Sequence, residues 1–144
     1  MNKPRYELEK VKAQIQKHGC FFRVKKKSTL AVVEFFRLTG GDNMSIGEAE
    51  EFIISELLKL TEDDFYETKF LHKLEAYADI YGKIINGDPW YIKLFLEYEE
   101  FIEGEDVHQV SFHPPRDSFI VSSGTEIGEG ETIYDDATNM WKLR

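Results

Sequence analysis

An Asn-Gly pair at 86–87, between two apolar stretches, constrains the fold of this chain more than any other feature. Asn-Gly is the strongest short-range signal for a two-residue β-hairpin turn. After it, WYIKLFLEYE at 90–99 alternates apolar and more polar residues, as a strand with one buried face requires. A third alternating stretch, VHQVSFH at 107–113, follows an acidic loop around Gly104. The pattern predicts an antiparallel meander over about 78–113.

In the first half of the chain the apolar residues recur with the period of a helix instead. Leu8, Val11 and Ile15 form one apolar stripe, and Ser45 with Glu48 makes a capping box that starts another helix. These signals predict helices at about 4–18, 29–38, 45–60 and 64–74, with a short extended segment at 20–24. Helices that precede an antiparallel sheet predict an α+β fold, with N-terminal helices packed on a small sheet.

Charge is distributed unevenly along the 144 residues. Residues 1–30 carry a net charge of +7, residues 31–120 a net charge of −13 and residues 121–144 a net charge of −3, which together give the total of −9. The basic N-terminal part, with RVKKK at 23–27, is either a phosphate-binding surface or a solvated helix face and turn. The overall acidity argues against a high-affinity, non-specific nucleic-acid binder.

The chain carries no motif of a common cofactor or metal site. It has no phosphate loop, GxSxG, HExxH or CxxC pair, and its histidines lack the spacing of zinc ligands, so we expect no metal and no cofactor. Cys20 is the only cysteine, which excludes an internal disulfide. No apolar run approaches the roughly 18 residues of a membrane span, and the N-terminus lacks a signal-peptide pattern. We expect a soluble, cytoplasmic protein without a membrane partner.

A set of polar residues falls on one region of the predicted sheet. Histidine suits proton transfer near neutral pH, and a lysine or arginine can stabilise a phosphorane-like anion. These groups suffice for RNA cleavage without a metal, although ordinary exposed residues on a solvent face would look the same. From the alternation, Tyr91 and His113 should lie on the same accessible face, together with Lys93. The set consists of Tyr81, Lys83, Tyr91, Lys93, Ser111, His113 and Arg116.

Several stretches, taken in order, resemble one known family. LEKVKAQIQKHG at 8–19 is followed by LTEDDFYET at 60–68, and then by DIYGKI, WYIKLFL and VHQVSFH within 79–113. This order resembles the MqsR family of toxins from toxin–antitoxin pairs, which is related in fold to RelE-type ribonucleases. The resemblance implies a RelE-like domain over 1–123, cleavage of mRNA at or away from the ribosome, and an antitoxin protein as partner. Residues 124–144 then form an acidic, glycine-containing and peripheral tail.

The resemblance carries over to the site residues only in part. The active-site tyrosine of the family falls on Tyr91, and its basic residue after SF falls on His113. Its lysine after DFY falls on Glu67, and its glutamine before D-[VI]-Y falls on Ala78, so two positions are lost. Lys69, close to Glu67, is a candidate for the missing charge. The expected site has His113 and Tyr91 as catalytic residues and Lys93, Lys69, Lys83 and Arg116 as phosphate-binding residues.

A second function remains open on the same residues. The losses at Glu67 and Ala78, with the acidity of the middle segment, favour a catalytically inactive relative that acts as a protein-binding module. Tyr91 and His113 favour the enzyme.

Overall fold

A computed structural model of the protein describes residues 3–18, 23–24, 26–102 and 105–144. The helices are α1 (Leu8–His18), α2 (Lys26–Leu38) and α3 (Ile46–Leu57), with the 3-10 turn η2 (Glu62–Asp64) after them. The strands are β1 (Arg23–Val24), β2 (Phe65–Leu71), β3 (Ala76–Ile85), β4 (Asp88–Ile102), β5 (Glu105–His113), β6 (Phe119–Ile120), β7 (Glu126–Ile127), β8 (Thr132–Asp135) and β9 (Met140–Leu143).

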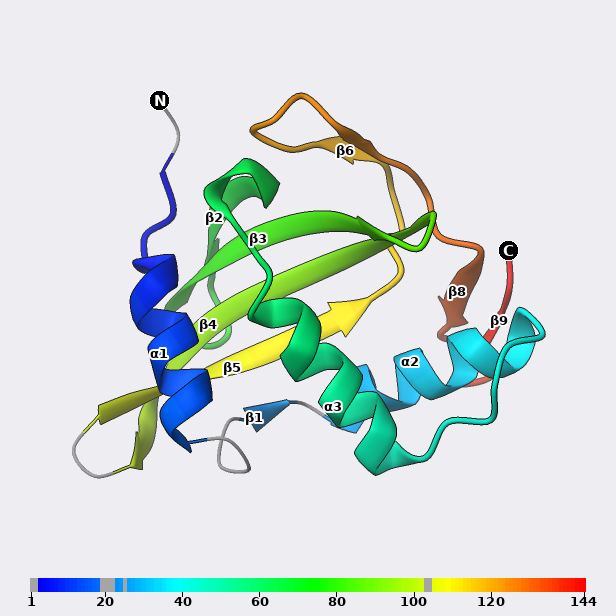
Figure 1. The fold of residues 1–144 in the computed structure, drawn as a ribbon, viewed down its shortest axis with the longest axis horizontal. Helices are drawn as coiled ribbons and strands as arrows, with labels where there is room; N and C mark the ends of the chain where they lie inside the picture. Colours follow the sequence, from blue (N-terminus) through cyan, green and yellow to red (C-terminus); the bar gives the residue numbers. More distant parts are fainter. Residues whose placement is uncertain (1–2, 19–22, 25, 103–104) are drawn as a thin grey trace.

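The main sheet is an antiparallel meander with one parallel strand at its edge. Its strand order is β1-β5-β4-β3-β2, and the short β1 pairs in parallel with β5 (Figure 1). Asn86 and Gly87 form the β3–β4 turn with φ values of 51° and 85°, the left-handed pair that a two-residue hairpin requires. The predicted α+β fold, with helices before the sheet, is confirmed.

The helix predicted at 64–74 is wrong. A capping box does form between Thr61 and Asp64, where the Thr61 N–H donates to Asp64 Oδ2 at 3.0 Å, but it caps only the single turn η2. The chain then enters β2, which pairs along its length with β3. FYETKFL is rich in aromatic and β-branched residues, which favour strands. Pairing with β3 therefore overrides the local helix signal, and the meander begins at Phe65.

The helices cover one face of the main sheet. Leu8, Val11 and Ile15 of α1 pack into the same buried cluster as Trp90 and Phe112 of the sheet. The ring of Phe35 in α2 meets Trp90 edge-on at 4.9 Å between centroids, and Phe52 in α3 meets Phe112 at 6.0 Å. Burial of each such side chain contributes about 1.5–3 kcal/mol.

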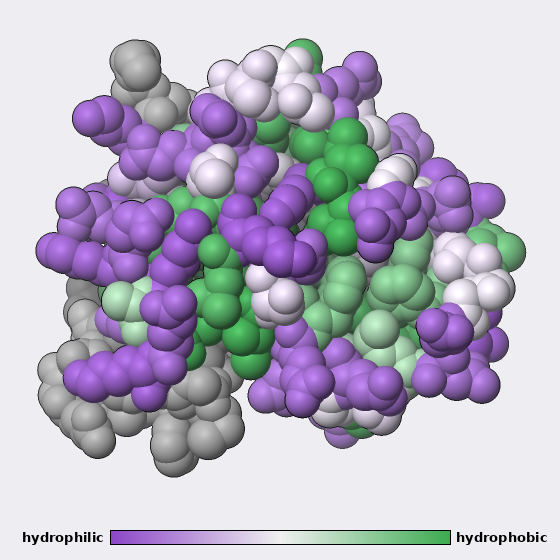
Figure 2. Space-filling view, viewed as in Figure 1, coloured by the Kyte–Doolittle hydropathy of each residue, from purple (hydrophilic) through white to green (hydrophobic). Residues whose placement is uncertain are grey.

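The helix side of the molecule presents a mostly hydrophilic surface. Figure 2 shows this side, with hydrophobic surface gathered in the middle of a hydrophilic rim. Phe36, Phe52 and Leu58 are among the partly buried residues that pack against the core. No helix in the described ranges is long and apolar enough to cross a membrane.

Ser28 of α2 provides a hydrogen-bond partner for the edge of β5 beyond the end of β1. β1 pairs only with Gln109 and Val110, so the backbone beyond them needs another partner. The Phe112 N–H donates to Ser28 Oγ at 2.8 Å, and that hydroxyl lies 3.5 Å from the carbonyl of Val110. One side chain thus satisfies a buried backbone donor and fixes the start of α2 beside the end of β5.

The C-terminal residues pack onto the rest of the chain. The strand predicted in DSFIVSS is β6, which forms its own two-stranded sheet with β7 rather than extending the meander. β8 and β9 form a hairpin beside α2 (Figure 1). Ile127 and Thr132 are buried, so 124–144 is not a loose extension. The division into 1–123 and 124–144 stays a prediction.

The β6–β7 hairpin lies over Gly82 on the sheet face opposite the helices. A Cβ at Gly82 would lie 2.5 Å from Cε2 of Phe119 and 2.8 Å from Cγ1 of Ile127, so both strands of the hairpin would have to move. Gly128 has open space around it and suits a control.

We expect Gly82→Ala to lower the free energy of unfolding by about 1–3 kcal/mol, because it overpacks this contact. Urea unfolding followed by circular dichroism measures the change. Gly128→Ala should stay within about 0.5 kcal/mol of the parent. Equal stability of the two variants would show that Phe119 and Ile127 do not press on Gly82.

Candidate functional site

The β4–β5 register brings Tyr91 and His113 together. The two residues are direct cross-strand partners, and their rings stack with centroids 4.9 Å apart at an interplanar angle of 22°. Lys93 and Ser111 are the next partners with the same parity. Directly opposite residues in an antiparallel pair project from the same face, so the four share one face, as the alternation predicted. Tyr91 and His113 are half-buried there rather than fully accessible.

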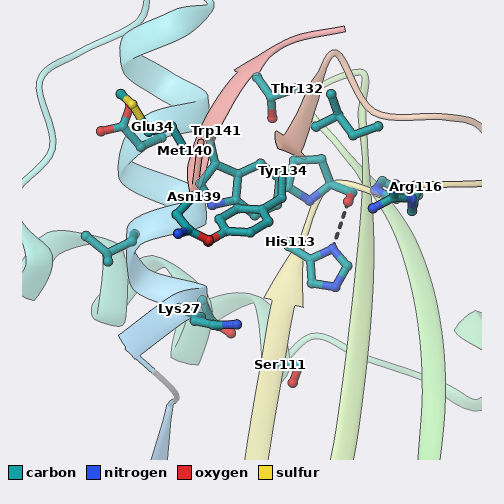
Figure 3. A pocket seen from close by; sticks show the side chains of 15 residues that line it. Lys27, Glu34, Ser111, His113, Arg116, Thr132, Tyr134, Asn139, Met140 and Trp141 are labelled. Atoms are coloured by element: carbon teal, nitrogen blue, oxygen red, sulfur yellow. Dashed lines mark hydrogen bonds between the residues drawn. The ribbon is translucent and has the colours of Figure 1, made fainter. Parts of the chain in front are cut away.

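His113 is held in one tautomer by its backbone neighbour. Its Nδ1 lies 2.8 Å from the carbonyl oxygen of Pro114, which can only accept, so Nδ1 carries the proton and Nε2 keeps its lone pair (Figure 3). Burial lowers the pKa of His113 below its ordinary 6.5; the bond to Pro114 opposes this shift, and the charge of Lys93 adds to it. At neutral pH the ring is therefore uncharged, with Nε2 ready to accept a proton.

The pKa of Tyr91 is shifted in the opposite direction. Burial raises its pKa to about 12, and the nearby Glu67 and Tyr66 add to the shift. The hydroxyl therefore keeps its proton at neutral pH and acts as a donor. A proton acceptor and a proton donor thus lie side by side, and the donor, whose pKa is far above neutral, gives up its proton only to a strongly basic atom.

The lysines predicted for the site divide between the two faces of the sheet. Lys69 pairs with Ala78, which places it on the Tyr91 face, where it is exposed. Lys83 pairs with Trp90, on the face that the helices cover, so the structure does not bring it to the site.

Tyr81 is likewise buried on the helix face, where it pairs with Ile92. The physical reason is the two-residue turn at 86–87, which pairs odd-numbered residues of β3 with even-numbered residues of β4. Tyr81 and Lys83 therefore face away from Tyr91 and Lys93. The Asn-Gly pair already implied this arrangement, because a two-residue turn fixes which residues of the two strands pair.

Glu67 lies on the same face as the candidate catalytic pair. It pairs with Ile80, which pairs in turn with Lys93. Its carboxylate contributes to the raised pKa of Tyr91. A negative charge here disfavours a phosphate. Lys93 lies in the same cross-strand row as Glu67, two strands away, and Lys69 lies two residues farther along β2.

A cavity of about 680 Å³ opens beyond the β5 edge, between the N-terminal half of α2 and the β8–β9 hairpin (Figure 3). Ser111, His113 and Arg116 line it from the sheet side, and Lys27 lines it from α2. The predicted Arg116 is thus on the same cavity as His113. The hairpin contributes Thr132, Tyr134, Asn139, Met140 and Trp141.

Aromatic rings connect the sheet face to this cavity. Trp141 lies 6.2 Å from His113 and 5.5 Å from Tyr134, measured between ring centroids. Sequence reasoning missed both residues because it treated 124–144 as a peripheral tail. The alternating apolar residues in TIYD and MWKL were the available signal for a hairpin.

Arg144 ties the hairpin to the loop that follows His113. Its guanidinium donates to the carbonyl oxygens of Gly130 at 2.8 Å and Arg116 at 2.9 Å, and it pairs with Glu129 at 3.0 Å. A Cβ at Gly130 would clash with Cβ of Pro114, so the backbone approaches closely there. The hairpin wall of the cavity is therefore fixed to the loop that follows β5. Within the described part of the chain, no three His, Cys, Asp or Glu residues cluster as metal ligands would.

We expect the Cε1 proton of His113 to titrate in NMR with a midpoint below 6.5, because burial favours the neutral ring. Between that midpoint and about 6.5 the unfolded chain binds more protons, so the free energy of unfolding should fall as pH falls through this window. His113→Gln assigns the signal and should flatten the pH dependence. A midpoint above 6.5 would contradict the buried, neutral ring.

Comparison with known proteins assigns no family. No protein-family model matches the chain, and no curated protein matches it. Membership of the MqsR family stays a prediction from short motifs, and the site itself has to support any function.

Proposed function

We propose that the protein is an endoribonuclease that cleaves mRNA without a metal, in the cytoplasm, as the toxin of a toxin–antitoxin pair like those of the MqsR family. The observation that carries the proposal is the stacked pair of Tyr91 and His113, a proton donor and a proton acceptor side by side on a half-buried sheet face. Cleavage of mRNA would inhibit translation, and an antitoxin protein would be the partner.

The chemistry follows from the two protonation states. Nε2 of His113 takes the proton from a ribose 2′-hydroxyl, and the 2′-oxygen attacks the adjacent phosphorus. The bond from phosphorus to the 5′-oxygen breaks, and that oxygen takes the proton of the Tyr91 hydroxyl. The products are a 2′,3′-cyclic phosphate and a 5′-hydroxyl, and the protons on His113 and Tyr91 are then exchanged with solvent.

Cations close to the pair support the same reaction. The charge of Lys93 is near enough to His113 to contribute to its lowered pKa, and Lys93 projects from the same face, so it can stabilise a phosphate bound over the edge of the stacked rings. Positive charge placed where anionic charge develops is among the largest contributions to catalysis. Arg116 stands on the other side of His113, at the cavity.

Glu67 favours a second candidate, the catalytically inactive protein-binding module. Its carboxylate is close enough to Tyr91 to help raise the pKa of that hydroxyl, so it would repel a phosphate bound beside Tyr91. In that case the polar face would bind a cationic partner surface instead of RNA.

We expect the purified protein to cut a long transcript in the presence of EDTA, leaving 2′,3′-cyclic phosphate ends. His113→Ala should reduce the cleavage rate by about 10²–10⁴-fold, because it removes the general base. Lys93→Ala should reduce the rate on the order of 10²-fold, because it removes charge stabilisation. Lys83→Ala is the matched control: it removes a lysine from β3 on the opposite face and should leave the rate unchanged.

The inactive alternative makes a different prediction in the same assays. Induced expression in bacteria without neighbouring genes would leave growth normal and transcripts intact. Full activity of His113→Ala would instead keep the enzyme and reject the assigned residue.

A further inference from the structure

We propose that the cavity between α2 and the β8–β9 hairpin is a subsite for one unstacked nucleobase of the RNA, with Lys27 and Arg116 on opposite sides for the adjoining phosphates. The nucleotide chemistry is inferred from the cavity itself, whereas its occupation by RNA rests on the proposed function. The hairpin lies outside the stretch that resembles the MqsR family, so the subsite is a property of this chain.

The cavity has the dimensions and lining of a ligand site. Its volume of about 680 Å³ falls within the roughly 300–1,000 Å³ of small-molecule pockets. Leu30 and Met140 add apolar surface and are 38 % and 60 % exposed, so the apolar lining reaches the surface. Exposed apolar side chains at a concave site are the groups that gain most from covering by a ligand.

The rings of Trp141 and Tyr134 provide the contact for a planar base. They stand at 67° to each other with centroids 5.5 Å apart, and both are only half-buried, so ring surface is free toward the cavity (Figure 3). Stacking of a base on such a ring is independent of sequence, because every base has a π face. Trp141 also borders His113, which places the base beside the candidate reaction centre.

Polar groups at the cavity fit the rest of a nucleotide. Lys27 is exposed, with Nζ 5.7 Å from the centroid of Tyr134, and Arg116 is exposed on the opposite side. The carboxylate of Glu34, which also lines the cavity, is paired with Arg37, so the cations are not neutralised by it. A phosphate attached to a base on Trp141 would therefore meet positive charge.

Asn139 offers a means to read the edge of a base. The Tyr134 hydroxyl donates to its Oδ1 at 3.3 Å, which fixes the amide orientation. Among the described residues, none accepts a hydrogen bond from its Nδ2, so this donor is available to a ligand. A fixed amide donor beside a stacking ring favours bases with an acceptor at that position.

The two tryptophans of the chain make the test direct. Trp90 is buried in the core and Trp141 lines the cavity, so their indole N–H signals report on two separate places. We expect nucleoside 5′-monophosphates to shift the Trp141 signal in a ¹H–¹⁵N spectrum and to leave the Trp90 signal in place. Nucleosides should bind about tenfold more weakly, and ribose 5-phosphate should leave Trp141 unshifted. Trp141→Phe assigns the signal.

Variants separate the base contact from the phosphate contact. Trp141→Ala should weaken nucleotide binding by roughly 10–100-fold, because it removes the stacking ring. Lys27→Ala should weaken the binding of nucleoside monophosphates and leave the binding of nucleosides unchanged. Lys142→Ala is its control: it removes an exposed lysine of the same hairpin that pairs with Asp135 and does not line the cavity.

The outcomes distinguish this inference from the proposed function. Nucleotide binding at Trp141 by a protein that cleaves no RNA would uphold the subsite and reject the ribonuclease. RNA cleavage without any shift of Trp141 up to ~10 mM nucleotide, about tenfold above a Kd of 1 mM, would overturn the subsite and leave the ribonuclease standing. A shift caused only by an apolar dye would overturn the subsite as well.

Discussion

The pairing register of β4 with β5 decides both what this protein buries and what it presents. Ile92 opposite Phe112 and Leu94 opposite Val110 carry the helix-covered core, while Tyr91 opposite His113 and Lys93 opposite Ser111 project from the other face. A slip of one residue would exchange the faces and place lysine and histidine under the helices. The packing of the core fixes this register, and the register in turn fixes the distance between His113 and Tyr91. No other interaction is needed to position these two side chains beside each other.

The surroundings of this pair come from three distant parts of the chain. Ser28 of α2 closes the open edge of β5, Phe119 packs beside Tyr91 at 6.0 Å, and Trp141 packs beside His113. Together they exclude water from two titratable side chains without removing them from the surface. That partial burial lowers the pKa of His113 and raises the pKa of Tyr91, so both shifts favour the uncharged forms. The protonation states of the pair thus depend on residues that belong to no recognisable catalytic motif.

The parts of the structure that local chemistry dictates could be predicted from the sequence. The Asn86-Gly87 turn, the capping box at Ser45 and the alternation in β4 and β5 each act within a few residues, and each has the expected form. β2 carries two competing local signals, because a capping box precedes it while its aromatic residues favour a strand, and pairing with β3 decides between them. The cavity depended on contacts such as Arg144 with the 115–116 loop, which no local pattern reveals. Lys83 was predicted on the Tyr91 face but lies on the helix-covered face. The two-residue turn at 86–87 already implied this, because it pairs Lys83 with Trp90.

The position of Phe119 against Gly82 has a consequence for any linear ligand on the Tyr91 face. The ring closes one end of that face, next to Tyr91, while Lys69 marks an exposed position toward the other end. A chain that enters from the Lys69 side cannot continue straight along β3 and has to turn across β4 and β5 toward α2. This face therefore discriminates between ligands by their stiffness. A nucleic-acid duplex, with a persistence length of about 150 base pairs, cannot follow such a bend within a few residues, whereas a single strand can.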